Sequence, residues 1–183
     1  LKIERQVNKK FFDENKIKIF KYLELGNTEK DLGDIKDVEE EILLNLPTRA
    51  RQLVKTFDVL QPRPIGSTEG VVVVNNELNE QLVSTGFIQI RPSNYEEALV
   101  LWTALKSDVV KKQMFYLQSG SIQPEITPTN FKQYVIIPIP KGKTKEKILF
   151  MMKEDIKGAR DSFKEYKDNK KLARNKFLES LGI

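Results

Sequence analysis

The C-terminal segment places the strongest limit on how this chain can fold. From Lys145 to Leu181 there is no proline and only one interior glycine, Gly158. Apolar side chains recur there mostly at steps of three and four residues, which predicts one narrow stripe along an α-helix. The stripe consists of Ile148, Met152, Ile156, Ala159, Phe163, Tyr166, Ala173 and Phe177, and Lys170 occupies a position where the pattern expects an apolar residue.

A helix of this length would be about 55 Å long. The preceding part of the chain, roughly 140 residues, would form a domain with a radius of gyration of about 14 Å. The far end of the helix would therefore need a partner outside its own domain. We expect a domain over residues 1–142 and a long helix over 143–183, which pairs with another helix through Met152, Ile156, Ala159, Phe163, Tyr166, Ala173 and Phe177. The alternative is that the stripe packs on its own domain.

The net charge of +5 is distributed unevenly along the chain. Residues 1–140 contain 18 Lys and Arg against 19 Asp and Glu, whereas residues 141–183 contain 13 against 7. A basic segment beside a neutral domain indicates an anionic partner, nucleic acid first. A solvated helix with a lysine-rich surface would explain the same charges.

Several kinds of chemistry are excluded by composition. The chain has no cysteine and no histidine, which rules out thiolate and imidazole metal sites, disulfides and Ser-His-Asp triads. It has no glycine-rich phosphate loop. A carboxylate-only metal site remains open, but the adjacent acids Glu39-Glu40-Glu41 point in different directions and favour a solvated face. No apolar run approaches the roughly 18 residues of a membrane span, so we expect a cytoplasmic protein.

The pattern of the first 140 residues predicts an α/β (α+β) domain with a small mixed β-sheet, followed by the coiled-coil helix. Strands are expected at 17–23, 71–74, 87–90 and 133–140, which are rich in β-branched or aromatic residues. Ser93 with Glu96 predicts a capping box that opens one helix, and Ser107 predicts the start of a second helix over 108–117. Thr48 is expected to cap a short helix that carries Arg49 and Arg51.

Six segments, taken in order, resemble the DNA-specificity subunit of type I restriction–modification systems. They are Leu46-Pro-Thr-Arg-Ala50 with Val54-Lys-Thr-Phe-Asp-Val-Leu60, Ser84-Thr-Gly-Phe87, Leu105 to Gln118, Gly120-Ser-Ile-Gln-Pro-Glu-Ile126, Ile137-Pro-Ile-Pro140 and the terminal charged helix. The chain departs from the family at Lys141–Lys147, where a Glu-Gln pair is usual, and at Phe57, where glycine is common. These departures suit a half-length subunit or the recognition domain of a fused methyltransferase, and the absence of an initiator methionine favours a fragment.

The resemblance implies one target recognition domain followed by one spacer helix, without catalytic activity. In the family, two such helices pair antiparallel, so that the recognised DNA site is bipartite. The implied partners are double-stranded DNA, a DNA methyltransferase subunit, a restriction/translocase subunit and, through the C-terminal helix, a second copy of this chain. The resemblance implies no cofactor in this chain, because S-adenosylmethionine, ATP and Mg would belong to the partner subunits.

Sequence-specific DNA binding requires cations for phosphates, and amides, guanidinium groups or hydroxyls for base edges. Side chains of these types in expected loops and on the 108–117 helix are the candidate contacts: Arg49, Arg51, Arg63, Arg91, Lys111, Lys112, Gln118, Ser119 and Gln123. The prolines on both sides of Arg63 stiffen its backbone. Two other functions stay open on these residues alone: an adaptor that binds a protein through its basic helix, and an enzyme that uses carboxylates and a divalent cation.

Overall fold

The computed structural model describes residues 2–3, 6–29, 33–36, 38–151 and 153–154. The chain divides into two compact units, residues 1–140 and 141–183, and each is described by itself. In the second unit, residues 142–151 and 153–154 are helical. The predicted pairing residues Met152, Ile156, Ala159, Phe163, Tyr166, Ala173 and Phe177 lie outside the described residues. The division expected between 142 and 143, and the coiled coil itself, stay predictions.

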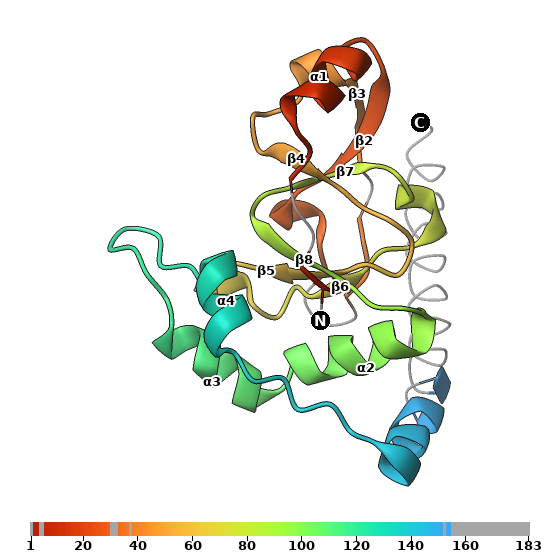
Figure 1. Cartoon of the computed structure of the whole chain (residues 1–183), viewed down its shortest axis with the longest axis vertical. Coiled ribbons are helices and arrows are strands. Elements are labelled where there is room, and N and C mark those ends of the chain that lie inside the picture. The colour runs from red at the N-terminus through yellow and green to blue at the C-terminus, as the bar shows by residue number, and fades with distance from the viewer. Residues whose placement is uncertain (1, 4–5, 30–32, 37, 152, 155–183) are drawn as a thin grey trace, which may run out of the picture. The chain divides into compact units, whose positions relative to one another are not determined.

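Two four-stranded sheets form the centre of the first unit (Figure 1). The strands are β1 (Lys2–Ile3), β2 (Ile19–Leu23), β3 (Glu40–Ile42), β4 (Ala50–Leu53), β5 (Val59–Pro62), β6 (Val72–Val73), β7 (Leu82–Ser84) and β8 (Phe87–Arg91). One sheet has the order β1-β8-β5-β6 and is antiparallel throughout. The other has the order β3-β2-β7-β4, and its β2–β7 pair is parallel. The expected α/β class with mixed strand pairing is confirmed, with two small sheets instead of one.

Among the described residues of the first unit, four α-helices cover the outer faces of these sheets. They are α1 (Lys9–Asn15), α2 (Tyr95–Leu105), α3 (Asp108–Tyr116) and α4 (Pro128–Tyr134). In Figure 1, α1 lies at one end beyond the β3-β2-β7-β4 sheet, and α2, α3 and α4 lie at the other end beyond β5 and β8. Within the described part of the chain, no helix is long and apolar enough to cross a membrane.

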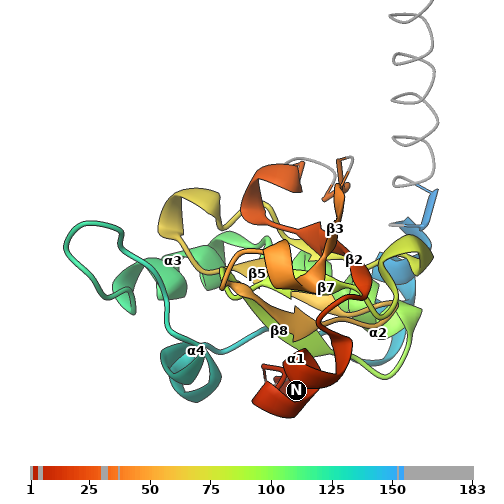
Figure 2. The same cartoon turned by 90° about the horizontal axis from the view of Figure 1, so that it is seen from above.

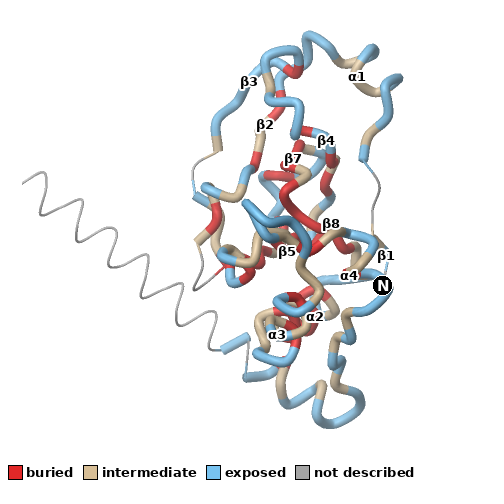
Figure 3. The backbone as a smooth tube through the Cα atoms, turned by 90° about the vertical axis from the view of Figure 1, so that its left-hand side faces the viewer, coloured by how far each residue is buried: buried red, intermediate tan, exposed pale blue. Residues whose placement is uncertain are grey.

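Strand β8 is buried on both faces, because it lies between the helices and the second sheet. Ile88 and Ile90 pack in a core that includes residues of α2, α3 and α4. Phe87 packs in the opposite direction, in a core shared with Leu23 and Val83 of the other sheet. Successive side chains of a strand point to opposite faces, so Gln89 also faces the second sheet. Figure 3 shows the resulting continuous burial along β5, β7 and β8.

The carboxylate of Asp58 joins the two sheets from the inside. Its side chain is completely buried and accepts four hydrogen bonds: from the backbone N–H of Lys55, from Gln89 Nε2, and from Nε and Nη2 of Arg91, all at 2.7–2.8 Å. Gln89 Nε2 also donates to the carbonyl of Leu53 in β4 (2.9 Å). The two sheets are thus joined through one buried anion and an amide that it orients.

The turn before Asp58 uses a backbone conformation that side chains rarely adopt. Phe57 has φ 73°, in the left-handed region that favours glycine. Its N–H donates to the carbonyl of Val74 (2.8 Å), and its ring packs against Tyr95 with centroids 5.2 Å apart. The position where the resembled family commonly has glycine is therefore one where glycine would relieve strain.

The helix starts agree with the sequence pattern within one residue. Ser107 caps α3, accepting a hydrogen bond from the N–H of Val110 (3.4 Å), as predicted. The cap of α2 is Asn94 rather than Ser93, because Asn94 Oδ1 accepts from the N–H of Glu97 (2.9 Å). Ser93 instead donates its backbone N–H to Glu97 Oε2 (2.9 Å).

Two expected elements are wrong. The strand predicted at 133–140 is absent, since α4 takes residues 133 and 134, and residues 135–141 form no regular structure. The side chain of Gln113 makes the hydrogen bonds that a neighbouring strand would make. Its Oε1 accepts from the N–H of Ile136 (2.8 Å), and its Nε2 donates to the carbonyl of the same residue (2.9 Å). The short helix predicted after Thr48 is also absent, because residues 50–53 pair with β7 as strand β4.

We predict that Asp58→Ala destabilises the domain by about 3 kcal/mol, because it removes the acceptor and leaves Gln89 and Arg91 without their buried partner. Urea unfolding followed by circular dichroism measures the change. Asp108→Ala is the matched control, since the carboxylate of Asp108 also pairs with a cation but is 82% exposed, and such pairs contribute little. Equal stabilities of the two variants would contradict the role given to Asp58.

Candidate nucleic-acid interface

The two edges of the β3-β2-β7-β4 sheet carry opposite charges. Edge strand β3 contains Glu40 and Glu41 and follows Glu39. The opposite edge strand, β4, begins next to Arg49 and contains Arg51. Because DNA is a dense polyanion, the β3 edge repels it and the β4 edge attracts it.

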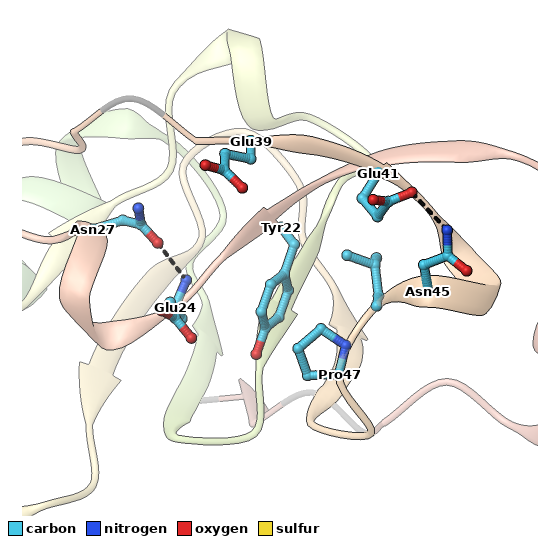
Figure 4. A pocket seen from close by; sticks show the side chains of 8 residues that line it. Tyr22, Glu24, Asn27, Glu39, Glu41, Asn45 and Pro47 are labelled. Carbon is cyan, nitrogen blue, oxygen red and sulfur yellow. Dashed lines mark hydrogen bonds between the residues drawn. The ribbon is translucent and has the colours of Figure 1, made fainter.

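A pocket of about 450 Å³ opens beside the acidic edge (Figure 4). It is lined by Tyr22, Glu24, Asn27, Glu39, Glu41, Asn45, Leu46 and Pro47. The Glu41 carboxylate accepts from the N–H of Ile42 and from Asn45 Nδ2, and these bonds lower the pKa of Glu41. The pocket therefore keeps a negative charge that does not suit a phosphate.

The acidic cluster does not have the arrangement of a metal site. Glu40 makes an ion pair with Lys21 on the neighbouring strand (3.8 Å), and Glu41 is held by Ile42 and Asn45. No group of three or more Asp or Glu residues in the described ranges is placed to hold a metal ion. The solvated acidic face is the interpretation that agrees with this arrangement.

The two arginines beside β4 differ in how far they are engaged. Arg51 Nε donates to the carbonyl of Thr48 (2.8 Å), and its guanidinium lies 5.3 Å from the centre of the Phe12 ring. Arg49 is exposed, and among the described residues its guanidinium has no partner. Its backbone is fixed nonetheless, because its carbonyl accepts from the N–H of Thr85 (2.9 Å). Arg49 therefore combines a fixed position with an available charge.

Arg63 is the centre of a structural network rather than an exposed cation. Its Nη1 donates to the carbonyl of Thr85 (2.9 Å), its Nε donates to the carbonyl of Ile126 (3.2 Å), and its Nη2 forms an ion pair with Glu125. The guanidinium uses its planar fork to connect three segments that are distant in sequence. The side chain of Arg63 points into the domain, where its guanidinium is occupied by these contacts. We therefore leave Arg63 out of the proposed DNA contacts.

Contacts through Thr85 and Arg63 place four segments next to one another: residues 48–51, 84–86, 62–65 and 119–126. Gly86 accepts from the N–H of Arg63 (2.8 Å) and donates its own N–H to Ser84 Oγ (3.1 Å). The Ser84-Thr-Gly-Phe87 segment is thus the tight turn between β7 and β8. On the far side of Arg63, Glu125 pairs with both Pro64 and Ser119.

Residues 119–125 form a loop that projects from the domain between α3 and α4 (Figures 1 and 2). Ser119 and Glu125 exchange two backbone hydrogen bonds, of 2.9 and 3.0 Å, which close its base. The residues of its tip, Gly120, Ser121, Ile122, Gln123 and Pro124, are all exposed. Three candidate residues, Gln118, Ser119 and Gln123, are brought together by this loop.

The candidates on α3 differ from each other. Lys111 makes ion pairs with Asp108 (3.0 Å) and Glu69 (3.3 Å), and these contacts raise its pKa, while the pKa of Asp108 is lowered by the same bond. Its charge is permanent but partly neutralised. Lys112 is exposed and has no ion-pair partner among the described residues. Of the two, Lys112 is the better phosphate contact.

Arg91 lies apart from the other candidates. It stands at the end of β8 away from the β7–β8 turn and pairs with Lys2 of β1 across the sheet. Its guanidinium holds Asp58. Its role in the described fold is structural, and we leave it out of the proposed contacts as well.

Sequence reasoning did not identify Thr85, Glu125 or Ile122. Thr85 and Glu125 act through backbone and side-chain contacts with Arg63, which only the tertiary structure brings within reach. Ile122 carried a local signal, since it is an isolated apolar residue in a stretch of turn-forming residues, and its side chain is 93% exposed.

We predict that Arg63→Ala loosens the 119–125 loop and destabilises the domain by roughly 1–3 kcal/mol, because Glu125 loses a charged hydrogen-bond partner. Arg63→Lys should keep the positive charge but lose the planar guanidinium with its several donors, and so restore the stability only partly. The hydrogen-exchange rates of the Ser119 and Glu125 backbone amides measure how often the base of the loop opens. Unchanged exchange in Arg63→Ala would rule out the anchoring role.

Neither a protein-family model nor a curated protein matches this chain, but solved structures do. One is the crystal structure of the HsdS subunit from Thermoanaerobacter tengcongensis, with a TM-score of 0.68 and 21% sequence identity over 88% of this chain. Another comes from a study of complex assembly and conformational transition of the type I R-M system, with a TM-score of 0.65 and 23% identity over 86% of this chain. The chain spans 41% of the length of each. This chain therefore has the fold of the type I restriction–modification specificity subunits.

Proposed function

We propose that this chain is the DNA-recognition module of a type I restriction–modification specificity subunit and that it has no catalytic activity of its own. The observation that carries the proposal is the fold shared with HsdS over 88% of the chain. The order of the short segments along the sequence supports it independently. The basic edge at β4 and the exposed polar loop at 119–125 supply the side-chain types that duplex DNA requires.

In this proposal the side chains divide into two groups. Arg49, Arg51 and Lys112 contact phosphates, which sets the position of the domain along the duplex. Gln118, Ser119 and Gln123 reach base edges, because amide and hydroxyl groups can match the donors and acceptors of the major groove. The acidic β3 edge faces away from the DNA, since like charges repel.

The module would deliver other subunits to its target. We propose that a DNA adenine methyltransferase subunit, and through it a restriction/translocase subunit, act at the site that this chain recognises. S-adenosylmethionine, ATP and Mg would be bound by those partners, in the cytoplasm. Pairing of the C-terminal helix with an equivalent helix would hold two recognition domains apart and make the target bipartite.

We predict that the chain binds duplex DNA with a strong dependence on salt, because each phosphate neutralised contributes about −0.9 to the slope of log K against log salt concentration. Arg49→Ala should make the slope less steep by about 1. Fluorescence anisotropy with a labelled duplex between low and physiological salt measures both values.

The control variant is Lys36→Ala, which removes a cation of similar exposure near the acidic side of the domain, where Lys36 pairs with Glu29. It should leave the slope unchanged. No binding at low salt, or a slope near zero, would contradict DNA recognition. Combined with binding to a partner protein, that result would favour an adaptor that associates through its basic helix.

We predict from the sequence that Phe163→Asp weakens self-association or methyltransferase docking, because a charge in the middle of an apolar seam is costly to bury. Residues 1–140 should remain folded, which circular dichroism checks. Sedimentation of both proteins tests the assembly role. That role is excluded if the natural chain is monomeric at high concentration and the variant still binds the methyltransferase.

A further inference from the structure

The 119–125 loop is held in one shape from both ends. At its base, Ser119 and Glu125 pair with each other, and the N–H of Ile65 donates to the carbonyl of Pro124 (3.1 Å). Arg63 holds Glu125 from below. At its tip, Gly120 has φ 96°, and a Cβ atom there would lie only 3.1 Å from the carbonyl oxygen of Gln123. A loop so constrained loses little conformational entropy when it binds a ligand.

The constrained tip presents two adjacent side chains to solvent. Ile122 is 93% exposed, and the side-chain amide of Gln123 is exposed and has no hydrogen-bond partner among the described residues. The tip carries no charge, and the carboxylate of Glu125 at its base is paired with Arg63. Nothing in the tip therefore repels a phosphate backbone.

A single exposed isoleucine is common and needs no explanation. Here it stands beside an amide with no hydrogen-bond partner among the described residues, on a projecting loop whose base is closed by the Ser119–Glu125 bridge. The major groove of DNA is about 12 Å wide and admits elements as wide as a two-stranded ribbon, so such a loop can enter it. In that groove an A·T pair presents two features: adenine offers an acceptor and a donor that match the amide of glutamine, and thymine offers a methyl group that suits an apolar side chain.

We infer that the 119–125 loop enters the major groove and reads an A·T base pair, with Gln123 on adenine and Ile122 against the thymine methyl group. This inference rests on the proposed function and adds to it the kind of base pair that this loop specifies. Arg63 is then a positioning residue, which keeps the loop in its reading conformation without touching DNA.

The experiment begins by selecting duplexes from a random pool with the 183-residue chain. The selected target is then made with deoxyuridine in place of each thymidine in turn, which removes only the methyl group. At one position this change should weaken binding of the natural chain about fourfold, the value expected for one buried methyl group. Ile122→Ala should bind the two duplexes equally well.

The second comparison replaces each adenine in turn with 7-deazaadenine, which lacks the N7 acceptor. The natural chain should lose on the order of tenfold in affinity at the adenine paired with the sensitive thymine, and Gln123→Ala should lose nothing further there. Ile17→Ala is the matched control, because Ile17 is 87% exposed but lies beside strand β2 on the other sheet. It should respond to both replacements as the natural chain does.

The outcomes distinguish base reading by the 119–125 loop from DNA recognition by the chain as a whole. If both loop variants respond to the deoxyuridine and 7-deazaadenine replacements as strongly as the natural chain does, the base-reading role of the 119–125 loop is wrong. DNA recognition by the chain would remain supported in that case. A pool from which the natural chain enriches no sequence would overturn sequence recognition itself, and the reading loop with it.

Discussion

The buried carboxylate of Asp58 is the contact on which the arrangement of the two sheets depends. A buried anion is tolerated only when its hydrogen-bonding capacity is filled, and here the partners come from the β4–β5 turn and from β8. Gln89, oriented by this anion, also reaches the carbonyl of Leu53 at the end of β4. Both sheets are thereby fixed relative to each other, and with them the β7–β8 turn that contacts Arg49 and Arg63.

A second ionic contact, which is only half-buried, joins other distant segments nearer the surface. Arg63 and Glu125 form a pair whose side chains are 19% and 32% exposed, and the pair joins the β7–β8 turn to the base of the 119–125 loop. Two of the four arginines between residues 49 and 91 are thus used to build the structure. Of the candidate cations, Arg49, Arg51 and Lys112 remain exposed, and these are the ones proposed to contact the phosphate backbone.

The charge pattern of the domain also gives its proposed interface a direction. Counted along the sequence, residues 1–140 are close to neutral, which by itself argues against a basic DNA-binding surface. In the fold, the acids of β3 and the arginines beside β4 are sorted to opposite edges of one sheet. A net charge close to zero therefore hides a separation of negative and positive charges across the sheet. The electric field of such a charge separation orients an approaching polyanion.

Local pattern alone determined much of this protein. It placed one helix start at Ser93, one residue before the observed cap Asn94, and another at Ser107, and it placed strands around residues 19–23 and 87–90. Composition excluded histidine and cysteine chemistry. Local pattern failed at residues 133–140, where the predicted strand does not form and the backbone N–H of Ile136 donates to the side chain of Gln113. It also failed at Thr48, where the residues that follow pair with β7 as a strand instead of forming a helix. The tertiary structure alone decided which arginines are structural, and it alone brought the β7–β8 turn and the base of the 119–125 loop to Arg63. The reason is that helix caps and turns depend on neighbours within a few residues, whereas the partners of Arg63 lie 22 to 63 positions away.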